Sequence, residues 1–218
     1  MPLLYKKQES ELLYGIWKVT ESNEELSAFL VHPNFDYINN ERRKQEKLAI
    51  RVLLKTLLNG EERNIGYYSS GKPYFTDKKG HISISHTKGY VAVALHPTFE
   101  IGLDIEQYSD RVRRISSKFI RSDEEPTILD AIKSKEIIPS RSNEIYAMLL
   151  HWSAKETIFK IMGEMDVDLL KNMRIFPFKI QRNGTFKAQE LGSTGKLMFQ
   201  IHYFLHSDFV FTYTVSST

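Results

Sequence analysis

The most regular pattern of hydrophobic positions lies between residues 39 and 58. Apolar side chains recur there three, four, seven and eight residues apart, at Ile50, Leu53, Leu54, Leu57 and Leu58. This period is typical of the buried face of an α-helix. Asn39 and Asn40 can cap its start, and Asn59-Gly60 can end it. The sequence therefore predicts a helix over residues 39–58.

Short runs in which apolar and polar residues alternate follow this helix. They cover residues 82–86, 91–95 and 101–106, and a Ser/Gly/Pro turn at residues 69–73 precedes them. Alternation with a period of two is typical of half-buried β-strands. Because the connections are short, we expect these three strands to form an antiparallel meander.

The second half of the chain repeats this order of helix and then strands. Residues 144–162 have apolar positions at helical spacing and end at Gly163, so they predict a second long helix. We also expect helices over residues 112–120 and 127–135, separated by a loop over residues 122–126.

Two hairpins are expected in the remaining residues. Asn183-Gly184 is a strong signal for a two-residue hairpin turn. Residues 206–208 join two further runs, residues 196–205 and 209–215. Each half of the chain thus combines a long helix with a few antiparallel strands. The sequence predicts an α+β fold of two subdomains, residues 1–98 and 99–218.

The composition fits this architecture and narrows the chemistry. The chain has 218 residues, of which 41% are hydrophobic and 26% charged, as expected of a globular protein. It has no cysteine, which excludes disulfides, cysteine-bound metals and a thiol nucleophile and favours a reducing cytoplasm. The first residues reach Lys6 before a long apolar run forms, so we expect no signal peptide and a soluble protein.

Positive charge is concentrated in two segments, although the net charge is only +3. Residues 42–55 and 111–121 each carry several Lys and Arg side chains. A basic segment is either a solvated helix face or a surface for an anionic partner. In the first segment, Arg43 and Lys47 lie on the side of the apolar stripe but nearer the start of the helix, where a cleft could begin.

The first candidate for chemistry is the strand over residues 101–106. Its alternation places Gly102, Asp104 and Glu106 on one face. Two carboxylates about 7 Å apart on one strand face repel each other unless water or a cation accompanies them. The strand is therefore either a solvated polar face or part of a divalent metal site, and Gly102 leaves room for a ligand near the backbone.

The second candidate lies on the long helix over residues 144–162. Trp152, Glu156 and Lys160 are spaced four residues apart and share a face, with Lys155 and Phe159 beside them. Glu156 and Lys160 form either a surface ion pair or a site for a metal-bound phosphate.

A third candidate, Ser85-His86, ends a predicted strand. The two residues either belong to an ordinary turn or offer hydroxyl, imidazole and backbone donors to a phosphate. They do not form a serine hydrolase triad, since the sequence has no Gly-x-Ser-x-Gly and neighbours on a strand point to opposite faces. The sequence also contains no glycine-rich nucleotide-binding motif of either common type.

In combination and order, four motifs resemble the 4′-phosphopantetheinyl transferases, specifically the long surfactin-synthetase-activating type. The motifs are Gly71-Lys72-Pro73, Ile82-Ser-Ile-Ser-His-Thr87, Ile101-Gly-Leu-Asp-Ile-Glu106 and Trp152-Ser-Ala-Lys-Glu-Thr-Ile-Phe-Lys160. The resemblance covers about residues 40–163. It implies a monomer of two similar subdomains, each with a long helix on a small antiparallel sheet, related by a pseudo-twofold axis.

The resemblance also implies an activity and its residues. The enzyme would transfer 4′-phosphopantetheine from coenzyme A to a serine of an apo acyl or peptidyl carrier protein and release 3′,5′-ADP. Asp104, Glu106 and Glu156 would hold Mg²⁺, and Lys160 would act with Glu156 in catalysis. Further positions that match contacts to coenzyme A are Lys72, Pro73, Ser85, His86, Asp104, Lys155, Lys160 and Arg43, with Lys47 or Arg51 as alternatives to Arg43.

The second basic segment suggests where a carrier protein binds. As a helix, it would place Arg113, Arg114 and Lys118 on one cationic side, suited to an acidic carrier. Two other functions remain open, a non-catalytic module that binds an anion or an acidic protein and a metal-dependent phosphohydrolase. Nucleic-acid binding is less favoured, because the basic segments lack interleaved aromatic residues.

Overall fold

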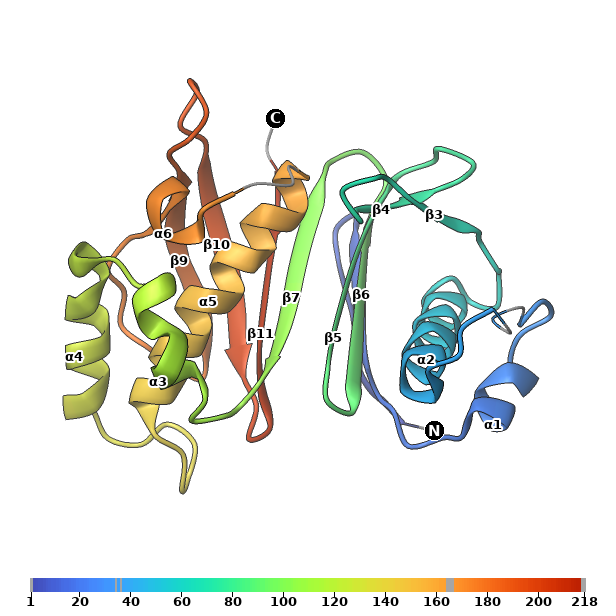
Figure 1. Ribbon diagram of the computed structural model, residues 1–218, viewed down its shortest axis with the longest axis horizontal. Coiled ribbons are helices and arrows are strands. Elements are labelled where there is room, and N and C mark those ends of the chain that lie inside the picture. Colours follow the sequence, from blue (N-terminus) through green and yellow to red (C-terminus); the bar gives the residue numbers. More distant parts are fainter. Residues whose placement is uncertain (1, 34, 36, 164–166, 217–218) are drawn as a thin grey trace. The chain divides into compact units, whose positions relative to one another are not determined.

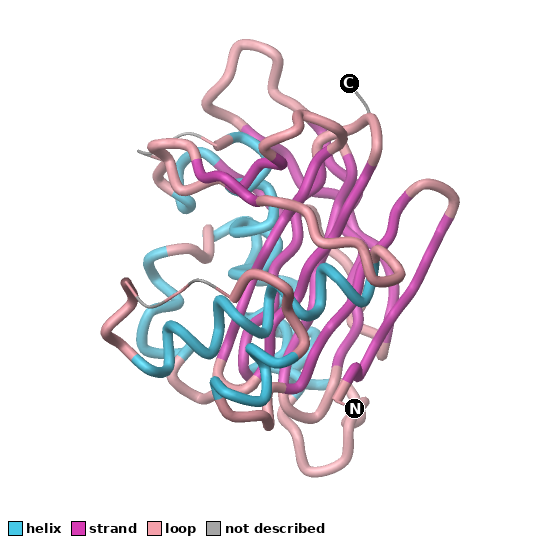
Figure 2. Tube along the Cα trace, turned by 90° about the vertical axis from the view of Figure 1, so that its right-hand side faces the viewer, coloured by secondary structure: helices cyan, strands magenta, loops and turns pink. Residues whose placement is uncertain are grey.

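The computed structural model describes residues 2–33, 35, 37–163 and 167–216. The chain divides into two compact units, residues 1–101 and 102–218. Each unit combines an antiparallel sheet with helices, which confirms the predicted α+β class (Figure 1). Figure 2 shows the same helices and strands, coloured by type.

The first unit is built around a four-stranded antiparallel sheet in the order β1-β2-β6-β5. Its strands are β1 (Leu3–Glu9), β2 (Leu12–Lys18), β5 (His81–Thr87) and β6 (Tyr90–His96). Helix α2 (Glu41–Leu57) packs on β2 and β6, and the short α1 (Asn23–Ala28) packs against α2. Strands β3 (Ile65–Tyr67) and β4 (Pro73–Phe75) form a separate hairpin.

Helix α2 confirms the helix predicted over residues 39–58. The side chain of Asn40 caps it by accepting a hydrogen bond from the backbone N–H of Arg43 at 2.9 Å. The helix ends before Asn59 and Gly60, both of which have positive φ. Its predicted apolar face is buried in the core of this unit, while its first turns carry the basic residues.

The second unit contains a five-stranded sheet in the order β7-β11-β10-β9-β8. The strands are β7 (Ile101–Gln107), β8 (Met173–Ile175), β9 (Asn183–Glu190), β10 (Met198–Leu205) and β11 (Phe209–Val215). The long helix α5 (Asn143–Met162) packs on β11, β10 and β8, and α4 (Glu125–Lys133) packs on α5. The remaining helices are α3 (Val112–Ile115), α6 (Leu169–Asn172) and 3₁₀ turns at Ser116–Lys118 and Ser122–Glu124.

Three sequence-based expectations about the strands and helices are corrected by this topology. Strand β7 does not continue a meander with β5 and β6, because it joins the other sheet beside β11. Asn183-Gly184 forms no hairpin turn but begins β9, where Gly184 lies opposite Tyr203. The helix expected over residues 112–120 is only one turn of α-helix followed by a 3₁₀ turn.

The loop expected over residues 122–126 is also corrected, because these residues form a 3₁₀ turn and the start of α4 at Glu125. The second long helix and the hairpin at residues 206–208 are confirmed. Helix α5 ends at Gly163, which adopts the left-handed conformation that glycine tolerates. The hairpin at residues 206–208 joins β10 and β11. Among the described residues, no helix has the length and hydropathy needed to cross a membrane.

Candidate active site

The residues singled out from the sequence fall into two groups, one in each unit. The first unit holds Arg43, Lys72, Pro73, Ser85 and His86, and the second holds Asp104, Glu106, Lys155, Glu156 and Lys160.

In the second unit, Gly102 allows helix α5 to approach strand β7. A Cβ atom at Gly102 would lie 2.1 Å from the backbone oxygen of Thr157 and 2.9 Å from Cγ1 of Ile161. Only glycine therefore fits here. The space beside Gly102 is filled by the helix rather than left open for a ligand, which corrects the sequence-based interpretation. This close packing brings Glu156 and Lys160 on α5 toward the carboxylates of β7.

Asp104 and Lys160 form the central contact of this group. Asp104 is buried, with 3% of its surface exposed, and its Oδ1 lies 2.8 Å from Nζ of Lys160. The same ammonium donates to the backbone oxygen of Leu103 at 3.0 Å. A buried carboxylate keeps its charge when a cation and hydrogen bonds compensate for the lost water. Lys160 therefore provides the buried carboxylate of Asp104 with a counter-ion.

Glu106 lies on the same strand and binds the indole of Trp152. The Nε1–H of Trp152 donates to Oε1 of Glu106 at 2.8 Å. Burial, and then the charge of Asp104, raise the pKa of Glu106 to about 7. The indole and Lys160 oppose this rise, because they stabilise the carboxylate. Glu106 therefore changes its charge close to neutral pH.

Glu156 shows the same kind of shift. Its pKa is raised, chiefly by burial and then by the charge of Asp104, while Lys160 acts in the opposite direction. Asp104 thus raises the pKa of both glutamates. Such mutual effects require that the carboxylates lie near one another. The structure therefore brings together the three acidic residues predicted from the sequence.

The donor set of this group suits a hard divalent cation. Mg²⁺ prefers oxygen ligands and usually keeps several waters while it binds one or two carboxylates and substrate phosphates. Asp104, Glu106 and Glu156 supply only oxygen donors, and their repulsion would be relieved by a cation. Among the residues described, however, no three His, Asp or Glu side chains are already arranged as a metal cage. A cation bound here would therefore have to share its coordination with water and substrate.

Lys155 is placed differently from its neighbours on α5. Its side chain is fully buried, and Nζ lies 2.9 Å from Oε2 of Glu124, which is also fully buried. The ammonium also donates to the backbone oxygen of Phe119 at 2.5 Å. Glu124 in turn accepts from the backbone N–H of Ile175 at 2.6 Å. Lys155 therefore ties α5 to two other segments of its unit, a role that the sequence analysis did not anticipate.

In the first unit, three predicted residues line one pocket, which we call the α2 pocket. It has a volume of about 590 Å³ and includes Arg43, Pro73 and His86. The charged or polar groups that join them are Asn40, Arg42, Glu46, Lys47 and Tyr67. No carboxylate among the described residues forms an ion pair with Arg43, so its guanidinium can bind an anion there.

The two alternatives to Arg43 are distinguished by their positions. Lys47 lines the α2 pocket, where its Nζ donates to the hydroxyl of Tyr67 at 2.8 Å. Arg51 lies about two turns further along the helix than Arg43, and its guanidinium donates to the backbone oxygens of Arg63 and Ile65. Burial lowers the pKa of Arg51. Arg51 does not line this pocket.

Lys72 and Ser85 lie outside the α2 pocket. Nζ of Lys72 is 3.0 Å from Oε2 of Glu100, which also faces His81. Ser85 is buried and lies on the face of β5 opposite Ile84 and His86, the two residues of that strand that line the pocket. The structure therefore does not bring these two residues together with Arg43.

The predicted docking residues also differ among themselves. Arg113 forms an ion pair with Glu144 and a longer one with Asp110, so its charge is largely neutralised. Arg114 and Lys118 are exposed, and neither pairs with a carboxylate of the described residues. These two residues therefore carry the accessible charge of this segment.

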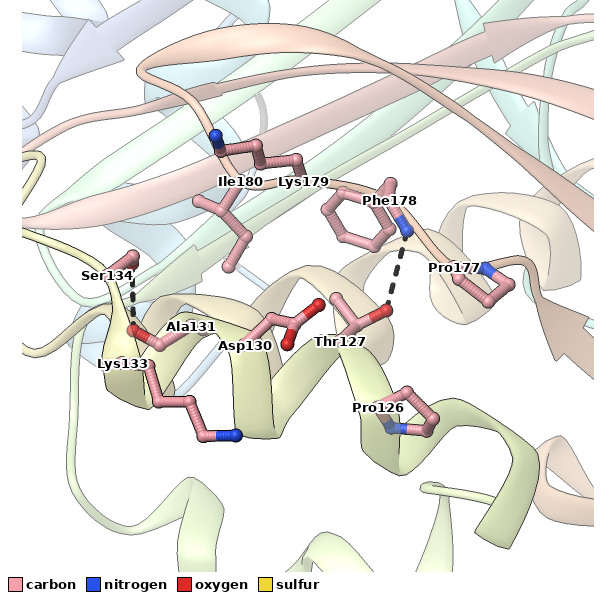
Figure 3. Close-up of a pocket in the computed structure, with 10 residues that line it drawn as sticks. All are labelled: Pro126, Thr127, Asp130, Ala131, Lys133, Ser134, Pro177, Phe178, Lys179 and Ile180. Carbon is pink, nitrogen blue, oxygen red and sulfur yellow. Dashed lines mark hydrogen bonds between the residues drawn. The ribbon is translucent and has the colours of Figure 1, made fainter.

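A further groove lies between α4 and residues 177–180 (Figure 3). It has a volume of about 560 Å³ and mixes apolar walls with charged groups such as Asp130 and Lys133. None of the predicted site residues lines it. We therefore place the candidate chemistry in the two groups above.

Two important residues were missed by sequence reasoning. Glu124 binds Lys155, and Glu46 is the acidic residue of the α2 pocket. Glu46 lies in the first basic segment, three residues after Arg43 and so on the same side of the helix. This spacing was visible in the sequence. Glu124 belongs to a run of acidic residues in a predicted loop, so nothing in the local pattern indicated its burial.

Comparison with models of protein families identifies a family for this chain. A family model described as the 4′-phosphopantetheinyl transferase superfamily matches residues 100–214. The matched region contains β7, α5 and all the residues of the carboxylate group. A search of curated proteins found no match.

Proposed function

The chain belongs to the 4′-phosphopantetheinyl transferase superfamily, and on that premise we propose that it transfers 4′-phosphopantetheine from coenzyme A to a serine of an apo acyl or peptidyl carrier protein. The reaction forms a bond between the serine oxygen and phosphorus and breaks the pyrophosphate bond, which releases 3′,5′-ADP. Features of the surfactin-synthetase-activating type, such as a monomer of two related subdomains, belong to the same proposal, as does a cytoplasmic location.

The observation that best supports this proposal is the cluster of Asp104, Glu106, Glu156 and Lys160. A reaction at phosphorus needs no protein nucleophile, because positioning and charge stabilisation supply most of the catalysis. Oxygen ligands and an adjacent ammonium are the groups that such a site requires. We propose that Asp104, Glu106 and Glu156 hold Mg²⁺, which would neutralise charge on the pyrophosphate.

The residues of the chain have distinct roles in this scheme. Lys160 already contacts Asp104. Its ammonium would also interact with the phosphate oxygens and stabilise the negative charge that develops as the leaving group departs. The pKa of Glu156 is raised in the protein without a metal ion. A carboxylate that holds Mg²⁺ through one oxygen still has a second oxygen that can accept a hydrogen bond and then a proton. We propose that Glu156 can take the proton of the serine hydroxyl.

The first unit supplies the binding of coenzyme A in this proposal. Arg43, with Lys47 beside it, would bind the 3′-phosphate, and Pro73 and His86 would form further walls of the α2 pocket. We also propose that Lys72 and Ser85 contact coenzyme A, and this part of the proposal rests only on the sequence motifs that contain them. Lys155 is left out of these contacts, because its ammonium is buried against Glu124 and Phe119.

We propose that an acidic carrier protein meets Arg114 and Lys118, whose charges are accessible. Arg113 contributes less, because Glu144 compensates its charge. Long-range attraction between opposite charges speeds association and weakens as salt rises. This assignment is independent of the roles given to the carboxylate cluster.

One experiment tests the activity. The protein is incubated with coenzyme A, Mg²⁺ and an apo carrier protein, and mass spectrometry monitors the carrier for one phosphopantetheine group on its serine. Removal of Mg²⁺ by a chelator is expected to stop the reaction. Release of inorganic phosphate from coenzyme A without modification of the carrier would instead indicate a phosphohydrolase. Binding without any turnover would indicate a non-catalytic module.

A further inference from the structure

The α2 pocket contains one residue whose charge opposes the binding of anions. Four basic or potentially basic side chains line it, namely Arg42, Arg43, Lys47 and His86. Glu46 is the acidic residue among those that line the pocket. Its side chain is only 17% exposed, so water screens its charge less than that of a surface glutamate.

The carboxylate of Glu46 contacts two of the basic residues at once. Its Oε1 lies 3.1 Å from Nε of Arg42, and its Oε2 lies 3.6 Å from Nδ1 of His86. Arg42 and His86 are themselves largely exposed at 65% and 52%. Arg42, and His86 when it is protonated, therefore face an internal anion, while the rest of their surface meets solvent.

A carboxylate and a phosphate use the same donors in the same way, because both accept charge-assisted hydrogen bonds from guanidinium and imidazolium groups. A phosphate that enters this pocket must either displace Glu46 from Arg42 and His86 or remain close to a like charge. Both alternatives weaken binding.

We propose that Glu46 sets the affinity of the α2 pocket by competing internally with the bound phosphate. The inference rests on the proposed function only in that the pocket receives the 3′-phosphate end of coenzyme A. It assigns to Glu46 a negative contribution to binding, which lets the product 3′,5′-ADP leave after transfer.

The test is direct binding of 3′,5′-ADP, measured by calorimetry without carrier protein. Glu46→Gln keeps the size of the side chain and removes its charge. We expect its dissociation constant to fall about three- to tenfold below that of the original protein, an effect in the range of partly exposed ion pairs. Glu61→Gln makes the same change in net charge at an exposed position outside the pocket. This control should leave the dissociation constant unchanged.

A second substitution tests the competition itself. If Glu46 withholds Arg42 from the ligand, Arg42→Gln should weaken binding more in the Glu46→Gln background than in the original protein. Equal losses in the two backgrounds would overturn the inference, as would unchanged or weaker binding by Glu46→Gln. Thermal unfolding confirms that each variant is folded.

The outcomes separate the two proposals. If the protein modifies the carrier but Glu46→Gln does not bind 3′,5′-ADP more tightly, only the role of Glu46 is wrong. If neither the original protein nor the variant binds 3′,5′-ADP, both the role of Glu46 and the assignment of the pocket to coenzyme A are wrong.

Discussion

Nζ of Lys155 lies 2.9 Å from Oε2 of Glu124, and neither side chain is exposed to solvent. Burial lowers the pKa of Lys155, and the charge of Glu124 acts in the opposite direction. Glu124 thus opposes the effect of burial on the pKa of Lys155. Because Lys155 precedes Glu156, this pair also fixes the part of α5 that carries the proposed catalytic residue.

This pair leads to a prediction about stability. Lys155→Met leaves the carboxylate of Glu124 buried without its counter-ion, so we expect a loss of about 3–5 kcal/mol in the free energy of unfolding. Adding Glu124→Gln should recover part of this loss, since Gln is neutral and can still accept from the backbone N–H of Ile175. Urea denaturation measures both variants.

An exposed ion pair provides the control for this comparison. Lys171 pairs with Asp168 but is 80% exposed on its side chain. Lys171→Met should change the free energy of unfolding by less than about 0.5 kcal/mol. A similar small effect of Lys155→Met would show that the buried pair is not required for the fold.

The sequence could predict positions on a helix, but it could not predict which side of the helix is covered. The helical spacing correctly predicted that Trp152, Glu156 and Lys160 share a face. Lys155 directly precedes Glu156, and its burial depends on Glu124, a residue 31 positions earlier in the chain. Local periodicity contains no information about such a distant partner.

The strands show the same limit. The alternation of residues 101–106 correctly predicted β7, yet its partner is β11 rather than β6. Asn183-Gly184 has the composition of a hairpin turn, but Gly184 lies within β9, where the phenol group of Tyr203 is 3.2–3.4 Å from the position of a Cβ atom. Strands β1 and β2 were not predicted. Residues 12–17 are almost continuously apolar and show no alternation, and β1 is an exposed edge strand without a clear apolar face.

Gly102 offers a second prediction, because it permits the contact between β7 and α5. In Gly102→Ala, the added Cβ would clash with the backbone of Thr157, which cannot move without the helix. We expect a loss of at least about 1–3 kcal/mol in stability and a lower kcat, since Glu156 and Lys160 would move away from Asp104.

Gly195→Ala serves as the matched control for this substitution. A Cβ atom there would make one ordinary contact, at 3.8 Å from Cδ2 of Leu197. Urea denaturation and the transfer assay should show no significant change for this variant. If Gly102→Ala behaved in the same way, the close approach of the helix would not be needed for activity.

The pKa of Glu106 predicts how stability depends on pH. Its pKa is raised from 4.5 to about 7 in the folded protein. Between these two values the folded state holds a proton that the unfolded chain has lost, so the free energy of unfolding falls as pH rises through this window. Above about pH 7 both states are deprotonated and this contribution stays constant.

Glu106→Gln cannot titrate and isolates this contribution. Between pH 5 and 8, the variant should gain stability relative to the original protein as pH rises, in urea denaturation curves measured without divalent cations. Parallel pH dependences of the two proteins would show that Glu106 has an ordinary pKa. Glu11→Gln, at an exposed position, is the control for a general change of charge.

The hydrogen bond from Trp152 to Glu106 gives a related prediction for activity. Trp152→Phe keeps an aromatic ring but removes the N–H that stabilises the carboxylate. The pKa of Glu106 should therefore rise above about 7, and proton competition with Mg²⁺ should extend to higher pH. We expect the Mg²⁺ concentration for half-maximal transfer to increase most below pH 7. The same requirement for Mg²⁺ at every pH would contradict this role of the indole.

The last prediction concerns the carrier protein and rests on the accessible charges of Arg114 and Lys118. Their joint replacement by Glu reverses two charges that no carboxylate of the described residues compensates. If they attract an acidic carrier, KM for the carrier should rise several-fold, its dependence on salt should become weaker, and KM for coenzyme A should stay nearly constant. The control is Lys179→Glu with Lys187→Glu, which makes the same change in net charge at exposed positions of the same unit. Arg113→Gln should have a smaller effect on KM than the double variant, because Glu144 already compensates Arg113. An equal rise in KM for the control pair would mean that only the overall charge matters, and the docking role of Arg114 and Lys118 would then be wrong.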